Sequence, residues 1–119
     1  MAEYLRAIWN QDTLELTEDF VVLCLNTAHQ VIGWVKVSSG GFSSSQADPR
    51  VIFAIALQTA TSALVLAHNH PSGSLSPSEE DRRITNRLVE AGKMLNINVL
   101  DHVSLTKESS FSFRENNLM

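Results

Sequence analysis

The chain has 119 residues, a length that fits one compact domain with a single hydrophobic core. Hydrophobic residues make up 44% of the sequence and charged residues 18%, which is typical of a globular protein and excludes a disordered one. The formal net charge is -4, so strong non-specific binding to DNA is not expected, because that binding depends on Lys and Arg neutralising phosphates. A local basic patch that binds DNA is still compatible with this net charge.

The cysteine content and the N-terminal residues indicate the cellular compartment in which the protein is expected. Cys24 is the only cysteine, so no disulfide can form within the chain, and it is most simply a small core residue. The first residues lack the basic and apolar regions of a signal peptide, and no apolar run approaches the roughly 20 residues of a membrane-spanning helix. We therefore expect a cytoplasmic protein that has no membrane partner.

The N-terminal third is predicted to hold a short helical segment and a hairpin. Residues 2–9 could form a short helix or an arm. Residues 19–26 are a continuous apolar, β-branched run of strand length, and residues 31–37 form a second such run after a short turn. These two runs are predicted to pair as a hairpin.

A buried helix and a strand are expected next. After a Gly/Ser-rich loop over 38–46, Asp48 is a suitable N-cap and Pro49 suits the first position of a helix over 50–62. This helix is apolar nearly all round, so we expect it to be buried on more than one side. The run over 63–67 has the length and composition of a short buried strand.

The next helix has strong start signals in two overlapping frames. In the first frame, Ser76 caps the helix, Pro77 occupies the first position and Glu79 completes a capping box. In the second frame, Ser78 pairs with Asp81 in the same way. The sequence leaves both frames open.

The rest of the chain completes a β-rich α/β domain. One apolar stripe should face the core, formed by Ile84, Leu88, Ala91 and Leu95. The exposed side of the same helix should carry Arg82, Arg83 and Arg87. Residues 97–105 and 110–115 are predicted strands. We therefore predict an α/β fold with a central mixed β-sheet packed by helices.

Two histidines follow the strand predicted over 63–67. On extended backbone, residues i and i+2 point to the same side, so His68 and His70 direct both imidazoles at one point while Asn69 faces away. Asp81 lies in the first turn of the next helix, which the Pro-Ser-Gly turn can fold back over the strand end. Two imidazoles, one carboxylate and an open fourth position are a typical catalytic zinc set.

Each of these residues has a simpler explanation when it is taken alone. A single histidine at a strand end is usually a hydrogen-bonded polar residue, and Asp81 would be an acid that the helix dipole favours. The combination in one register favours the metal site. The contiguous letters HNH do not indicate an HNH nuclease, whose name refers to residues spread through a ββα unit.

The stretch "HNHPSGSLSPSEED" resembles the JAMM signature of the JAB/MPN metalloproteases, H-x-H-x7-S-x2-D, with His68, His70, Ser78 and Asp81 in its four positions. More closely, the chain resembles the C-terminal domain of bacterial RadC in "ADPRVIFAIAL", "LVLAHNHPSG" and "NVLDHVSL". The resemblance begins near residue 17. It implies a JAB/MPN fold, which is cytidine-deaminase-like, as a single domain over 1–119. The helix-hairpin-helix region that precedes this domain in full-length RadC is not in the sequence.

The resemblance also implies a role for each site residue. The two histidines and Asp81 would hold Zn²⁺, and an upstream glutamate in an E-x-F setting would act as general base, a position that Glu18 fills ahead of Phe20. Ser78 would donate a hydrogen bond to the developing oxyanion. Other acids near the base position are Asp19, Glu15 and, more remotely, Glu3.

Two positions depart from the RadC-like pattern, and one pair is left without an assigned role. Gly40-Gly41 stands where such chains have Gly-Thr, and Arg50-Val51 where they have Arg-Glu, which puts the substrate surface in doubt but leaves the metal set intact. Arg50 could anchor the loop or contact substrate. We interpret Asp101-His102 as a structural pair or as one that orients a ligand, with direct ligation as the alternative.

The implied activity is hydrolysis of a peptide or isopeptide bond by a zinc-activated water, in a protein substrate or a peptide. The RadC name adds a link to DNA repair. The alternatives are a non-catalytic JAB-fold binding module that recruits a partner in DNA metabolism, and a DNA-associated accessory protein, which the negative charge does not favour.

Overall fold

The computed structural model describes residues 1–43 and 46–119, so two residues of the predicted 38–46 loop lie outside the described ranges. The elements in chain order are α1 (Ala2–Ile8), β1 (Asp19–Leu25), β2 (Val31–Ser39), α2 (Pro49–Gln58), β3 (Ala63–Asn69), α3 (Glu79–Leu95), β4 (Asn98–Leu105) and β5 (Ser110–Ser112). None of the helices in these ranges has the length and apolar content that crossing a bilayer requires.

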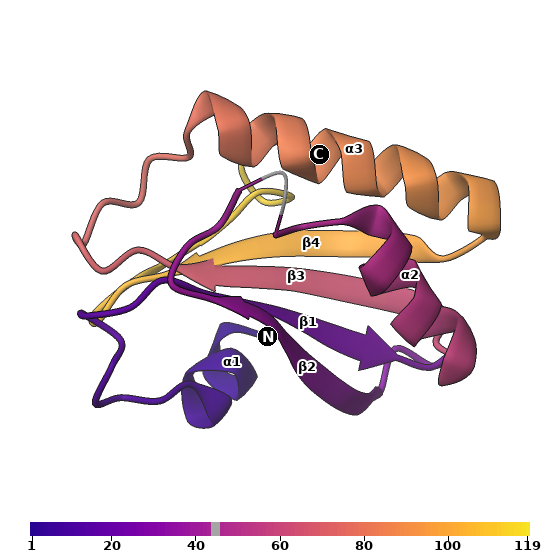
Figure 1. Ribbon diagram of the computed structural model, residues 1–119, viewed down its shortest axis with the longest axis horizontal. Coiled ribbons are helices and arrows are strands. Elements are labelled where there is room, and N and C mark those ends of the chain that lie inside the picture. Colours follow the sequence, from indigo (N-terminus) through magenta and orange to yellow (C-terminus); the bar gives the residue numbers. More distant parts are fainter. Residues whose placement is uncertain (44–45) are drawn as a thin grey trace.

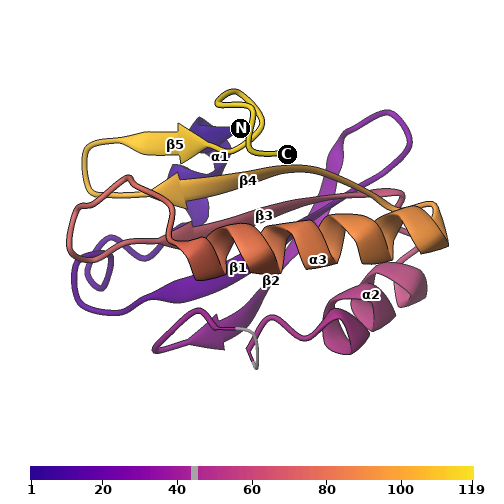
Figure 2. The same cartoon turned by 90° about the horizontal axis from the view of Figure 1, so that it is seen from above.

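The strands form one mixed sheet in the order β2-β1-β3-β4-β5. Strand β1 pairs antiparallel with β2 and β3, β3 pairs parallel with β4, and β4 pairs antiparallel with β5. Helices α2 and α3 cover one face of the sheet and α1 lies on the other (Figure 1). Figure 2 shows α3 running lengthwise over the sheet with α2 beside it. The predicted α/β class and central mixed sheet are confirmed.

The two central strands are continuous apolar runs because both of their faces are covered. Phe20 and Leu66 belong to the core under α2 and α3, whereas Leu23 and Val65 belong to the core on the α1 side. Every residue of β1 and β3 is buried as a result. Cys24 is a free, buried cysteine in the first of these cores, as predicted.

Helix α3 begins in the second of the two predicted frames. Ser78 is the N-cap, and its hydroxyl oxygen accepts a hydrogen bond from the Asp81 N–H at 3.0 Å. The Asp81 carboxylate in turn accepts from the Ser78 N–H at 3.0 Å. The frame with Ser76, Pro77 and Glu79 is therefore wrong, because only a helix that starts at Glu79 places Asp81 where it can close this reciprocal box.

Helix α2 begins as predicted, with the Asp48 side chain accepting from the Arg50 N–H and Pro49 in the first turn. It ends at Gln58, short of the predicted residue 62, and buries a single face. Val51 and Leu57 are 49% and 60% exposed. The expectation of burial on more than one side is wrong, since the sheet and α3 cover only the inner side of this helix (Figure 2).

The C-terminal elements follow the sequence with two differences. The predicted stripe on α3 is buried at Ile84 and Leu88 but 42% exposed at Leu95. The C-terminal end of α3 reaches past the strands of the sheet (Figure 1). Arg82, Arg83 and Arg87 are exposed, as predicted. The strand predicted over 110–115 is limited to β5, after which the chain turns and buries Phe113.

Candidate metal centre

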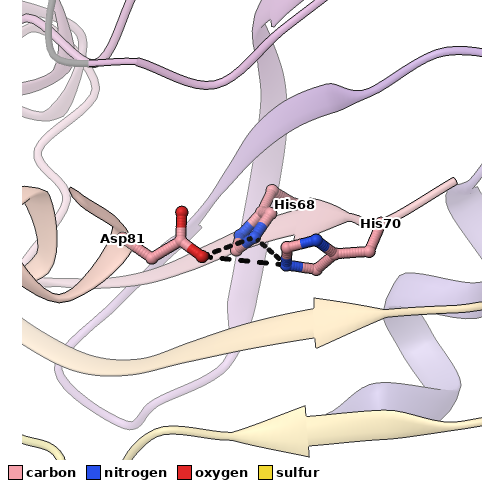
Figure 3. Close-up of side chains that lie close together, drawn as sticks. All are labelled: His68, His70 and Asp81. Carbon is pink, nitrogen blue, oxygen red and sulfur yellow. Dashed lines mark hydrogen bonds and ion pairs between the residues drawn. The ribbon is translucent and has the colours of Figure 1, made fainter. Parts of the chain in front are cut away.

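Three predicted ligands meet where β3 ends and α3 begins. His68 Nε2 lies 2.7 Å from His70 Nε2, and each of these nitrogens lies 3.8 Å from Asp81 Oδ2 (Figure 3). The three ligand atoms are within 4.8 Å of one another, which makes the cluster a group that could hold a metal ion. The period of two along the strand brings the imidazoles together, and the capping box directs the carboxylate at them.

The local backbone fixes this arrangement. The His70 N–H donates to the Leu105 carbonyl of β4 at 2.8 Å, so the strand end is held just beyond the last residue of β3. A tight turn follows, in which the Gly73 N–H donates to the His70 carbonyl at 3.0 Å. Gly73 has a φ of 86°, a conformation that favours glycine. The chain then reverses toward the first turn of α3.

The donor set fits a borderline metal ion such as zinc. His68 is fully buried, and this burial, with His70 beside it, lowers the pKa of His68 to about 3. The imidazole is therefore neutral at pH 7, which is the form that binds a metal. The Asp81 residue is 5% exposed, so the cluster combines two ring nitrogens with one shielded carboxylate. Such a mixed set suits zinc, and imidazole also suits copper, iron and nickel.

Glu18 lies beside this cluster, just ahead of β1. It is half-buried, and its burial raises the pKa of the carboxyl; the charge of His70 opposes that rise and the charge of Asp81 adds to it. The Phe42 N–H donates a hydrogen bond to the same carboxylate. Glu18 therefore interacts with two members of the cluster and keeps a pKa closer to neutrality than an exposed glutamate.

The alternative acids are engaged elsewhere. Asp19 pairs with Lys36 Nζ at 3.4 Å, on the face of the sheet where α1 lies. Glu15 is exposed and pairs with Lys107 Nζ at 3.6 Å. Glu3 belongs to α1, which is also on the far face (Figure 1). Among the acids that the sequence offered, Glu18 is the one whose charge interacts with the cluster.

Asn69 faces away from the cluster, as predicted, and has a function of its own there. Its side-chain oxygen accepts from the Asp19 N–H at 2.7 Å, and its amide nitrogen donates to the carbonyls of Leu14 and Thr17 at 2.8 and 2.7 Å. The residue between the two histidines thus anchors the segment that carries Glu18. Sequence reasoning gave Asn69 no role beyond spacing.

Ser78 is exposed and sits at the edge of the site as the α3 N-cap. Its oxygen accepts from the Asp81 N–H, and within the described ranges its hydroxyl proton is donated to no other group. The structure therefore brings Ser78 next to Asp81 with a hydrogen-bond donor still available.

The departures from the RadC-like pattern lie in the loop after β2 and in the first turn of α2. The Gly40 and Gly41 N–H groups both donate to the Glu18 carbonyl at 2.9 Å, and Gly40 has a φ of 94°. These glycines hold the backbone of the Glu18 segment. Arg50 is exposed, and its guanidinium binds the Asp48 carboxylate at 2.8 Å, so it closes on the cap of its own helix.

Behind the cluster, His102 contacts His68. Its Nε2 lies 2.7 Å from His68 Nδ1, and its Nδ1 lies 2.6 Å from Thr85 Oγ1. His102 is fully buried, which lowers its pKa well below the ordinary value, and the charge of His68 adds to this effect. Its neighbour Asp101 points elsewhere and accepts from Ser112 Oγ at 2.6 Å. The expected pair thus divides, with His102 behind the His68–His70–Asp81 cluster and Asp101 bound to β5.

Sequence reasoning missed two residues near the cluster. Thr85 lies four residues after Asp81 on α3, a spacing that places it on the same helix face and could have revealed it. Phe42 stacks on the His68 ring with centroids 4.6 Å apart and planes at 15°. It comes from the loop after β2, and no local pattern connects that loop to the histidines.

Comparison with known proteins agrees with the family resemblance seen in the sequence. A family model of the RadC-like JAB domain matches residues 1–118. Relatives include the UPF0758 proteins of Alkaliphilus metalliredigens (47% identical over 102 residues), Rubrobacter xylanophilus (46% over 102) and Chlorobium luteolum (44% over 105). The alignments cover 86–88% of this chain but 44–47% of each relative, so the chain spans less than half the length of these curated relatives. The chain belongs to the RadC-like JAB domain family.

Proposed function

We propose that this domain is a JAMM-type zinc metallohydrolase that cleaves a peptide or isopeptide bond with an activated water. The observation that carries the proposal is the convergence of His68 Nε2, His70 Nε2 and Asp81 Oδ2 beside the half-buried Glu18 carboxylate. A structural zinc site would more often be closed by cysteines, whereas this set has three ligands of the kind seen in catalytic sites.

A zinc ion held by His68, His70 and Asp81 would act as a Lewis acid and would lower the pKa of a coordinated water to about 7. The protein groups perform the proton transfers. Glu18 accepts a proton from the attacking water and returns it to the leaving amine nitrogen as the C–N bond breaks. Its raised pKa suits this task, because a base poised nearer to neutrality can also act as the acid.

Ser78 is proposed as the donor to the substrate carbonyl oxygen. Its oxygen is fixed by the Asp81 N–H, so the hydroxyl proton can be directed away from the helix axis. A preorganised donor stabilises the negative charge that develops on that oxygen during attack. The substrate class, a peptide or isopeptide bond, follows from the family resemblance.

The test compares two carboxylate-to-amide changes in the purified protein. Asp81→Asn removes a charged ligand but keeps an oxygen that can accept the Ser78 N–H, so the helix cap should persist. We expect zinc affinity to fall by a factor of at least about 10–100, the loss typical of residues that only support ligands. Glu18→Gln leaves all three ligands in place, so zinc content should be unchanged while cleavage falls by a factor on the order of 10²–10⁴.

The matched control is Glu15→Gln, because Glu15 is an exposed glutamate on the same segment. It should alter neither zinc content nor cleavage. The substrates are a broad panel of peptides and isopeptide-linked peptides at neutral pH, and zinc is measured by elemental analysis. Full activity in Glu18→Gln would refute its role as base. A zinc-loaded wild-type protein that cleaves nothing in the panel would favour the non-catalytic binding module.

A further inference from the structure

We propose that a buried hydrogen-bond relay from Thr85 through His102 to His68 selects the ring nitrogen that His68 presents to the metal. Thr85 and His102 would then be positioning residues for a ligand that they do not replace. This inference rests on the proposed function, because it concerns the same three ligands. It extends that function by explaining how one of them is prepared before the metal arrives.

The relay starts on α3. Thr85 Oγ1 lies 2.7 Å from the Asp81 carbonyl oxygen and 2.6 Å from His102 Nδ1, and both contacts are buried. A hydroxyl has one proton, and a carbonyl oxygen can only accept. Both contacts are hydrogen bonds only if the hydroxyl donates to Asp81 and accepts from His102. His102 therefore carries its proton on Nδ1.

The proton on His102 Nδ1 determines which nitrogens of His102 and His68 act as donor and acceptor in the rest of the relay. A neutral imidazole has one N–H, so His102 Nε2 is left as an acceptor. Its partner at 2.7 Å is His68 Nδ1, which must then be the donor. That assignment leaves His68 Nε2 unprotonated, with its lone pair directed at His70 and Asp81. The opposite direction would place a proton on the ligand atom.

Packing prevents the imidazole rings of His68 and His102 from rotating out of this hydrogen-bonded arrangement. Phe42 stacks on His68, and Phe113 stacks on His102 with centroids 4.4 Å apart and planes at 15°. Both histidines are fully buried, and Thr85 is too. A rotated ring would leave buried polar nitrogens without hydrogen-bond partners, which is costly. The relay is therefore rigid as well as directional.

Asp81 takes part both in the metal centre and in the hydrogen-bond relay behind it. Its carboxylate faces the imidazoles and its carbonyl oxygen accepts the Thr85 hydroxyl. The first turn of α3 thus contributes one ligand directly and orders a second from behind, through β4. Metal-binding histidines commonly donate their other N–H to a fixed acceptor, and here that acceptor is a third imidazole.

The first measurement uses the metal-free wild-type protein. Imidazole ¹⁵N shifts, read by long-range proton–nitrogen correlation, should show His68 protonated on Nδ1 and His102 also on Nδ1. A proton on His68 Nε2 would overturn the relay. This readout needs neither a variant nor activity, so it stands apart from the proposed hydrolysis.

The second measurement removes the hydroxyl. Thr85→Val keeps the shape of the side chain but leaves His102 Nδ1 without an acceptor, whereas Thr85→Ser restores one. Zinc affinity, measured by competition with a chromophoric chelator, should fall by about 10–100-fold in Thr85→Val and recover in Thr85→Ser. The Nε2–H form of His68 should become populated in Thr85→Val alone.

Thr59→Val is the matched control. The Thr59 hydroxyl makes the same bond to the carbonyl four residues earlier, at 2.8 Å to Ile55, but it lies at the end of α2, away from the metal centre. It should leave zinc affinity unchanged. If Thr85→Val folds and binds zinc as tightly as the wild type, the relay is refuted and the proposed function stands. If the wild type itself binds no zinc, the proposed function fails instead.

Discussion

Replacing Gly92 by alanine should destabilise the protein, although the same change stabilises most helices. Gly92 is buried in the last turn of α3, and its carbonyl accepts the Ile97 N–H at 2.9 Å as the chain reverses toward β4. A Cβ at this position would overlap the Ile97 carbonyl oxygen and touch the Phe53 ring. The obstacle is backbone, so it cannot rotate away, and the helix end must move.

The expected size follows from two opposing effects. Alanine is favoured over glycine in a helix by about 1 kcal/mol. Overpacking a fixed site costs about 1–3 kcal/mol and occasionally more. Because backbone must be displaced, we expect a steric cost at the upper end of this range, about 3 kcal/mol. After the gain of about 1 kcal/mol is subtracted, the free energy of unfolding should fall by about 2 kcal/mol.

Urea denaturation of Gly92→Ala, followed by circular dichroism, measures this change. The matched control is Gly33→Ala in β2, where no atom lies within 4 Å of the added Cβ. Glycine inside a strand is unfavourable by about 0.5–1 kcal/mol relative to alanine, so the control should be as stable as the wild type or more stable. A Gly92→Ala protein that unfolds at the wild-type urea concentration or above would refute the reasoning.

Two further predictions concern packing and burial. Leu88→Ala should lower the free energy of unfolding by about 2–5 kcal/mol, because Leu88 is fully buried. Leu95→Ala on the same helix should cost less than about 1 kcal/mol, because Leu95 is 42% exposed; equal losses of the two variants in urea denaturation would contradict the assignment of the stripe. Ser104→Ala should raise stability by about 1 kcal/mol, because in the described part of the chain the buried Ser104 hydroxyl has no hydrogen-bond partner; a loss of similar size in thermal denaturation would reveal a partner.

The sequence predicted those parts of the fold and site that depend on local pattern. Strands β1 and β3 were found because buried strands in the middle of a sheet are uninterrupted apolar runs. His68 and His70 were paired because period two is a property of one strand. Asp81 was joined to them by a short turn and a capping box, which are also local features.

The rest depends on contacts between distant segments. The contact of His102 with His68 requires the parallel register of β3 and β4, which is shifted by an irregularity between Leu64 and Val65. No pattern within either strand contains that register. The predicted burial of α2 on more than one side is wrong because an apolar segment without a clear period does not show which of its sides will pack against neighbouring elements.

The side chain of Asn69 restricts how this centre can be transplanted into another protein. A designer who copies the H-x-H pair and an acidic helix start onto a new strand would reproduce the ligands alone. The position of Glu18 relative to them is set in part by hydrogen bonds that join Asn69 to the backbone of Leu14, Thr17 and Asp19, in the segment that leads into β1. A graft without that segment would carry the three proposed ligands but not the proposed base. The smallest portable unit therefore adds residues 14–19, and the Gly40 and Gly41 N–H groups that bind the Glu18 carbonyl, to the histidine strand and the start of α3.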